Sequence, residues 1–221
     1  KPYFHFGPIT RTVKDAALMF DIMAGMDTRD PFSVPDDDSQ YVAATERSAS
    51  GMKIAYSPDL GTYPVSREVG AIIESAVGAF EETDASISEI SMDLNRSQQE
   101  ILDAFYQWAQ VTWETMLDGF SSAYDVDPLG EDKHKLNEKL RSIVFEGETI
   151  EATAYKKTDV LRTDVLDAVE SVFDEWDVLV TPTAAVPAFD YDTQGPTEIE
   201  GQPIEPARGW VLTQPFNMSG H

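Results

Sequence analysis

Few residues of this sequence have a type and spacing that would support covalent catalysis. Nucleophilic catalysis needs a serine, threonine or cysteine beside a base that accepts its proton, and the strongest candidates are the adjacent Ser121 and Ser122 in "DGFSSAYD". They follow a predicted helix C-terminus, without a glycine-rich turn and without a lysine or histidine close by in the sequence. No Gly-x-Ser-x-Gly nucleophile elbow and no phosphate-binding Gly-x-x-x-x-Gly-Lys motif occurs. We therefore predict no catalytic residue in this chain.

Metal and acid–base chemistry have equally weak signals. The sequence has no cysteine, which excludes disulfides, thiolate catalysis and cysteine-based metal sites. Its histidines, His5, His134 and His221, are scattered and form no i, i+4 pair. A glycosidase-like carboxylate pair is possible, but among 40 Asp and Glu residues chance pairs are expected. We expect neither a metal nor a cofactor.

Negative charge dominates the composition. Forty acidic residues against 16 Lys and Arg give a formal net charge of -24, which excludes a general nucleic-acid or anionic-membrane binder because phosphate binding needs a concentrated positive surface. With 42% apolar and 10% aromatic residues the chain should fold rather than stay disordered. An acidic surface repels itself in dilute buffer and is relieved by salt. We therefore expect a salt-loving source.

The absence of long apolar runs indicates a protein outside the membrane. No run approaches the roughly 18 apolar residues that a spanning helix needs, and no segment reads as a signal peptide. We expect a cytoplasmic protein. No internal repeat or low-complexity linker divides residues 1–221, so we predict a single compact unit.

The first half of the chain predicts alternating helices and strands. Thr12, with Asp15 three residues later, resembles a helix N-cap, and Gly25 suits the end of that helix, which is apolar over most of its surface and is expected in the core. A strand is predicted within 52–59, an amphipathic helix after Ser66, and a strand within 86–92.

The second half predicts more helix and one buried strand. A long helix is expected over 98–119, and helical sequence over 124–175 with breaks near "VDPLGEDK" and at Gly147. The apolar run in "DVLVTPTAAVPAF" fits a fully buried central strand, and residues 190–209, rich in proline and glycine, are predicted to be loop.

Three segments together resemble the amidase signature family, in the portion that follows its serine-rich signature. They are "GPITRTVKDAALMFDIMAGMDTRDPFS", "MKIAYSPDLGTYPVSREV", and "FDEWDVLVTPTAAVPAF" with the later "TQPFNMSGH". Their order and spacing agree with the family, whereas residues 95–150 match poorly. The resemblance implies an α/β fold, a mixed β-sheet flanked by several helices, with a helical substrate-shaping segment at about 95–175.

The resemblance also implies an activity and a missing part. The family hydrolyses amides, or transfers ammonia, with a lysine, a bridging serine and a nucleophilic serine that precede the segment opened by Gly7. We therefore expect the C-terminal portion of an amidase, cut at both ends and inactive alone, that acts on a small-molecule amide when complete and could form a homodimer.

Site residues are carried over from the same resemblance. Gln214, Phe216 and Asn217 match the family's turn beside the core sheet, and Asn217 is expected to hydrogen-bond backbone there. Arg11 matches an arginine for which a structural contact is expected. Tyr106, Trp108 and Trp210 are candidates for lining the acyl pocket, although each could equally be a core residue.

Two other functions stay open. The chain could belong to the glutamine-hydrolysing component of a tRNA-dependent amidotransferase, its A subunit, which tends to have an Ala-Asn-Leu-Ala-Gly-type turn where this chain has "PFNMSG". It could also be a non-catalytic binding or scaffold domain that kept the fold and lost the chemistry.

Overall fold

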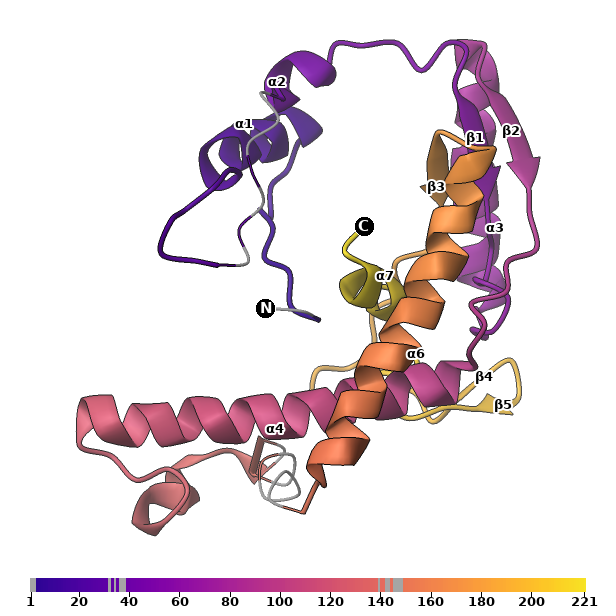
Figure 1. The fold of residues 1–221 in the computed structure, drawn as a ribbon. Helices are drawn as coiled ribbons and strands as arrows, with labels where there is room; N and C mark the ends of the chain where they lie inside the picture. The colour runs from indigo at the N-terminus through magenta and orange to yellow at the C-terminus, as the bar shows by residue number, and fades with distance from the viewer. Residues whose placement is uncertain are drawn as a thin grey trace.

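The computed structural model describes residues 3–31, 33, 35, 39–138, 140–141, 144 and 149–221. It is an α/β protein with a small parallel sheet at one side of the molecule and helices over the rest (Figure 1). The predicted break at Gly147 lies outside the described residues. The α-helices are α1 (Val13–Met23), α2 (Tyr41–Ala44), α3 (Arg67–Gly78), α4 (Gln98–Tyr124), α6 (Ala152–Glu170) and α7 (Gln214–Ser219). The 3-10 helices are η1 (Ala79–Thr83), η2 (Glu131–Lys135) and η3 (Ser171–Asp174).

The sheet holds three parallel strands in the order β2-β1-β3. They are β1 (Lys53–Tyr56), β2 (Ser86–Glu89) and β3 (Val178–Val180). In register, Ile54 of β1 pairs with Ile87 on one side and with Val178 on the other. The strand–helix–strand unit predicted for residues 52–92 is therefore present, and β1 is its buried member.

β3 is not the buried central strand that its apolar run predicts. Within the described residues it pairs with β1 alone, and its three residues are half-buried. A continuous apolar run fits a strand covered on both faces and on both edges. In this chain β1 covers one edge of β3, and the other edge has no partner among the described strands.

The long helices build the rest of the core. α4 extends five residues beyond the predicted end and crosses α6, as Figure 1 shows. Ile101, Phe105 and Trp108 on α4 are buried together with Val165 and Val169 on α6. Arg96, just before α4, pairs with Asp164 of α6 and fixes the crossing at one end.

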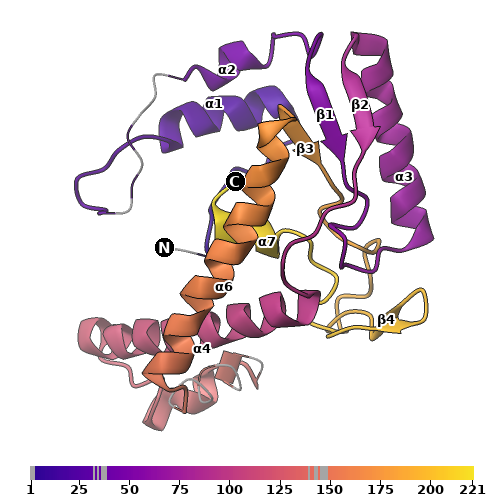
Figure 2. The same ribbon diagram turned by 45° about the vertical axis from the view of Figure 1, so that its right-hand side comes forward.

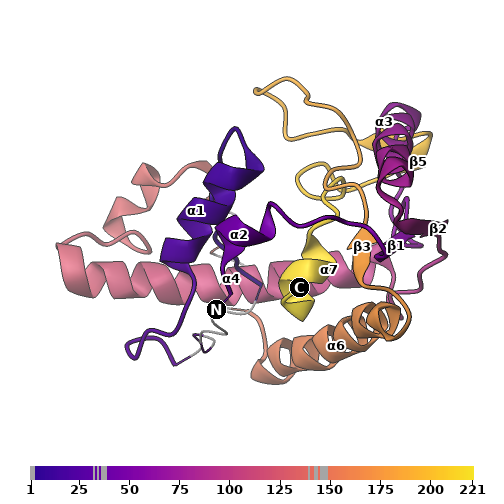
Figure 3. The same cartoon turned by 90° about the horizontal axis from the view of Figure 1, so that it is seen from above.

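α1 begins where the sequence predicts but does not enter the core. The Thr12 hydroxyl accepts a hydrogen bond from the Asp15 backbone N–H at 3.1 Å, and none of the residues of α1 is buried. Its main neighbour is α2, whose first N–H groups are capped by the Asp21 carboxylate, at 2.8 Å from the Tyr41 nitrogen. Figure 3 shows the sheet and α3 gathered on one side of the molecule, away from α1.

Two predicted irregular segments contain regular structure. The loop at 190–209 includes a hairpin of β4 (Glu198–Ile199) and β5 (Gln202–Pro203). Glu200 and Gly201 between these strands both have positive φ, at 48° and 80°, which is the two-residue turn that suits a hairpin. The predicted turn at "PFNMSG" is the short helix α7, which ends at Gly220 in the left-handed conformation, with φ of 88°.

Candidate functional site

The order of the strands places a candidate site at the carboxyl ends of β1 and β3. From β1 the chain passes through α3 to β2 on one side, and it returns through α4 and α6 to β3 on the other side. In open parallel sheets, ligands bind outside the carboxyl ends of the two strands at which the winding reverses. In Figure 2 the strand arrows point toward the part of the molecule that holds α7 and β4.

Backbone hydrogen bonds fix three segments against one another at this end of the sheet. Directly after the strands, the Ser57 nitrogen donates to the Val180 oxygen at 2.9 Å. Further along, the Ser66 nitrogen donates to the Ala185 oxygen, and the Ala185 nitrogen donates to the Trp210 oxygen, both at 2.8 Å. The segment after β1, the segment after β3 and the segment that leads into α7 and includes its first residue, Gln214, therefore form one connected structure.

Each of these three segments contributes buried side-chain polar atoms without a hydrogen-bond partner among the described residues. They are the Tyr63 hydroxyl, the Thr181 hydroxyl and both amide atoms of Gln214. Gln214 is only 2% exposed, and burial raises the pKa of Tyr63 above its usual value. A buried polar group without a partner costs about 1–3 kcal/mol, so the fold of the described chain does not by itself explain these groups.

A fourth polar residue at the carboxyl ends of the strands differs from these three because its hydroxyl has a hydrogen-bond partner. Ser57 is fully buried, and its hydroxyl accepts a hydrogen bond from the Leu60 backbone N–H at 3.1 Å. This bond closes a turn directly after β1. Ser57 is therefore accounted for by local structure, whereas Tyr63, Thr181 and Gln214 are not.

Tyr106 and Trp210 both lie at the turn formed by residues 205–210. The Trp210 indole nitrogen donates to the Pro206 oxygen at 3.0 Å, and Gly195 leaves room for that ring, because a Cβ there would lie 2.8 Å from the indole nitrogen. Burial, and then the neighbouring Glu205 carboxylate, raise the pKa of Tyr106. The Glu205 carboxylate accepts backbone hydrogen bonds from Ala207 at 3.0 Å and from Arg208 at 2.7 Å.

Trp108 lies elsewhere on α4. Two helical positions correspond to about 200° of rotation, so Tyr106 and Trp108 cannot share one face of the helix. Trp108 is 4% exposed and stacks on Tyr3, with ring centroids 5.1 Å apart.

Phe216 and Asn217 lie within α7. Phe216 is half-buried and packs against the core. The main-chain oxygen of Asn217 accepts a hydrogen bond from the Tyr3 nitrogen at 3.2 Å. The six predicted pocket residues therefore occupy several places, with Gln214 at the sheet edge and Tyr106 and Trp210 at the turn.

Tyr63 and Thr181 were not predicted as site residues. Both are polar residues that follow a parallel strand, Tyr63 in "DLGTYPV" after β1 and Thr181 in "TPT" directly after β3. That position is the available signal, since it is where such sheets bind ligands. Arg11 is exposed and forms no ion pair within the described part of the chain.

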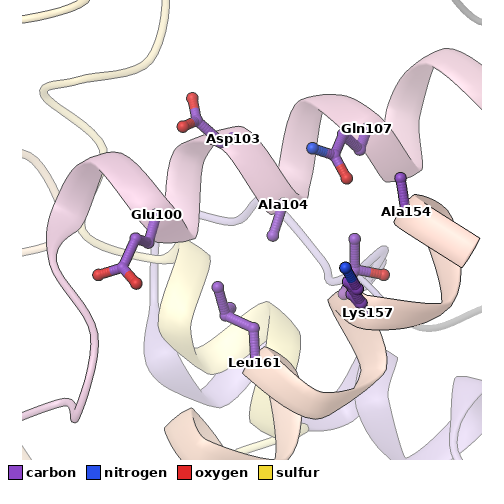
Figure 4. A pocket seen from close by; sticks show the side chains of 8 residues that line it. Glu100, Asp103, Ala104, Gln107, Ala154, Lys157 and Leu161 are labelled. Carbon is purple, nitrogen blue, oxygen red and sulfur yellow. The ribbon is translucent and has the colours of Figure 1, made fainter. Parts of the chain in front are cut away.

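A separate groove of about 240 Å³ lies between α4 and α6 (Figure 4). In the figure Ala104 and Leu161 point into it, and Asp103 points away from α6. Its charged residues Glu100, Asp103 and Lys157 are exposed to solvent. None of its polar side chains is both buried and without a partner in the described structure, so this groove lacks the property that distinguishes the sheet edge.

The described residues contain neither a metal-binding cluster nor a membrane-spanning helix. No three His, Asp or Glu side chains there are arranged to hold a metal ion together. No helix in the same residues combines the length and the apolar character needed to cross a membrane.

An α/β fold with a parallel sheet and a polar site at its carboxyl edge is compatible with many enzyme classes, and the comparisons with known proteins select one. The Amidase family model matches residues 3–221, so the chain belongs to the amidase family. Solved structures similar to it are amidase signature enzymes, including a bacterial aryl acylamidase with a TM-score of 0.87 and 31% identity, matched over 97% of this chain and 44% of that one.

Curated relatives include two kinds of amidase-family protein. An acylamidase from Rhodococcus erythropolis is 34% identical over 215 residues, which are 97% of this chain and 43% of the relative. The A subunit of the glutamyl-tRNA(Gln) amidotransferase from Macrococcus caseolyticus is 27% identical over 231 residues, which are 97% of this chain and 46% of the relative. The chain thus spans less than half the length of the relatives that it matches.

Proposed function

We propose that residues 1–221 are the C-terminal part of an acylamidase, an enzyme that hydrolyses the C–N bond of a carboxylic amide. The observation that carries this proposal is the 34% identity with an acylamidase over almost the whole chain, together with the similarity to an aryl acylamidase structure. The polypeptide would act on a small-molecule amide.

The chemical step would depend on residues that precede this chain. In the amidase signature mechanism a neutral lysine draws a proton through a bridging serine, and the second serine attacks the carbonyl. Backbone N–H groups then stabilise the oxyanion. Residues 1–221 would contribute the carboxyl edge of the sheet and the aromatic side chains around the turn at 205–210, and would be inactive alone.

An anilide substrate tests the proposal. The natural polypeptide that carries residues 1–221 is assayed for release of nitroaniline from 4-nitroacetanilide, beside residues 1–221 alone. We expect hydrolysis by the natural polypeptide and none by the isolated chain. Activity of the isolated chain would contradict the assignment of the catalytic residues to the preceding sequence.

The glutamine-hydrolysing component of the amidotransferase is the second candidate, since the protein from Macrococcus caseolyticus also matches 97% of this chain. It is less favoured because the identity is 27% rather than 34%. Release of ammonia from glutamine, with no release of nitroaniline, would support this candidate. If the natural polypeptide hydrolyses neither substrate, a non-catalytic binding or scaffold protein becomes the better hypothesis.

A further inference from the structure

We propose that the Gln214 side chain, assisted by the Thr181 hydroxyl, hydrogen-bonds the scissile amide group of the substrate and makes the site prefer amides to esters. This inference rests on the proposed function. It starts from the observation that Gln214 is 2% exposed while neither its amide nitrogen nor its amide oxygen has a partner among the described residues.

An unpartnered buried glutamine is a poor choice for stability alone. Buried polar groups in proteins are nearly always hydrogen-bonded, and methionine would fill a similar volume without the cost of an unpaired amide. The half-buried Gln98 side chain, by contrast, donates a hydrogen bond to the Gly209 oxygen. Gln214 therefore stands out as a residue whose polar atoms serve something outside the described chain.

The location of Gln214 in the fold indicates that its amide group binds a ligand. Gln214 begins α7, three residues after Val211, which forms a bridge to Ala184. The Leu212 nitrogen donates to the Thr183 oxygen at 3.2 Å, so the chain before α7 runs antiparallel to the segment after β3. The same antiparallel order brings Gln214 toward Thr181 at the carboxyl end of β3, where the winding of the sheet reverses.

The chemistry of the two groups matches an amide. A glutamine side chain offers both an N–H donor and a carbonyl acceptor, which is what a carboxamide needs for its own oxygen and N–H. The hydroxyl of Thr181 can donate or accept. Three rotatable bonds let the Gln214 amide turn toward a bound substrate without movement of α7. An ester has the same carbonyl but no N–H, so the acceptor atom of Gln214 would be left unpaired against it.

Kinetics on a matched pair of substrates tests this role. The natural polypeptide and its Gln214→Met variant are compared on 4-nitroacetanilide and on 4-nitrophenyl acetate, which differ in the N–H. Loss of hydrogen bonds of ordinary strength predicts that the variant loses about 10- to 100-fold in kcat/KM on the anilide. The loss on the ester should be several-fold smaller. Equal losses on the two substrates, or no loss, would overturn the proposal.

Control variants separate substrate contact from folding. Gln99→Met changes an exposed glutamine of α4 whose side chain donates to the Asp103 carboxylate at 2.7 Å, and should leave the kinetics and Tm unchanged. Gln214→Met should keep or raise Tm, and a fall of several degrees would mean that the amide has a structural partner, which contradicts the proposal. Thr181→Ser keeps the hydroxyl and should preserve the amide preference, whereas Thr181→Val should reduce it.

The outcomes distinguish this inference from the function on which it rests. A natural polypeptide that hydrolyses neither substrate contradicts the acylamidase proposal, and the inference falls with it. A polypeptide that hydrolyses the anilide but is indifferent to Gln214→Met keeps its function and overturns the inference alone.

Discussion

α1 and α4 begin in the same way and end in different environments. A hydroxyl side chain caps each helix and accepts a hydrogen bond from the backbone N–H three residues later, Thr12 from Asp15 at 3.1 Å and Ser97 from Glu100 at 3.3 Å. Both helices carry many apolar residues. Yet none of the described residues of α1 is buried, whereas seven residues of α4 are buried in the core.

The difference shows that local sequence decides where a helix begins, while neighbouring elements decide what it buries. α4 has α6 and α7 against it, but α1 has mainly α2. Ile22 on α1 is 79% exposed, and Ile9, ahead of the helix, is 100% exposed. Such apolar patches usually mark a surface that another chain or segment covers. The first 31 residues hold four basic and four acidic residues, so this region lacks the net charge of -24 that the whole chain carries.

The largest expected effect comes from removing an aromatic ring on α4. Trp108→Ala should lower the free energy of unfolding by about 3–5 kcal/mol, because it removes a buried side chain and leaves a cavity. Phe20→Ala on α1 should cost only about 1–2 kcal/mol, because Phe20 stays 37% exposed and its ring packs edge-on against the ring of Tyr41. Urea denaturation followed by circular dichroism at fixed salt measures both.

These two substitutions can also contradict the comparison. If Trp108→Ala and Phe20→Ala lowered the free energy of unfolding equally, α1 would be buried in solution, which contradicts the difference between the two helices. Tyr41→Ala is a useful third variant, since it removes the other ring of the Phe20 pair, whose centroids lie 4.7 Å apart. Its cost should resemble that of Phe20→Ala.

A smaller effect is expected for association of the chain through α1. Residues 1–221 should form dimers or larger species in sedimentation velocity, increasingly so at high salt, because salt screens the repulsion between acidic surfaces. Replacing both Val13 and Ile22 by glutamine should shift the population toward monomer. Ile72 and Val160, also exposed apolar residues but on α3 and α6, provide the matched control when both are changed to glutamine.

Either of two results would count against association through α1. The chain could sediment as a monomer at all salt concentrations, which contradicts the expected homodimer. Alternatively, the control pair could dissociate the dimer as well as the α1 pair does, which would place the contact elsewhere. A dimer that weakens as salt rises would show that ion pairs, rather than apolar side chains, hold it together.

Local patterns predicted most of the elements. The helix starts at Thr12 and Ser66, and the strand at Lys53–Tyr56, depend on residues close in sequence. The exposure of α1 and the edge position of β3 depend on which segments lie beside them, and a pattern of apolar residues carries no information about that. The hairpin at 198–203 was missed because its strands have only two residues each.

The candidate site was less predictable than the fold. Gln214 was identified through the family resemblance, but the feature that singles it out, an amide buried without a partner among the described residues, exists only once α7 has packed. Tyr63 and Thr181 are separated by more than a hundred residues and come to the same edge through the pairing of β1 with β3. No local spacing connects them. Tyr106 and Trp108 were both predicted to line the acyl pocket, and helical geometry places them on different faces of α4.

The smallest expected effect concerns the difference between the caps of α1 and α4. In α4 the Glu100 carboxylate accepts a hydrogen bond from the Ser97 backbone N–H at 2.9 Å, which completes a capping box. In α1 the Asp15 carboxylate accepts no such bond from the Thr12 backbone N–H among the described contacts. Bonds from the Ser97 backbone, the Ser97 hydroxyl and Arg96 lower the pKa of Glu100 to about 2.

This lowered pKa makes the α4 cap dependent on pH. Because the pKa is lower in the folded state than the ordinary value of 4.5, the ionised carboxylate contributes stability above about pH 4.5 and loses it as the pH falls toward 2. Glu100→Gln should therefore make the free energy of unfolding fall less between these pH values than it does in the unmodified chain. Asp15→Asn, the matched change in α1, should leave that fall unchanged. Carboxyl NMR should show Glu100 titrating near pH 2, and a midpoint near 4.5 would mean that the capping box does not hold its carboxylate in solution, so that the two helices differ only in what they bury.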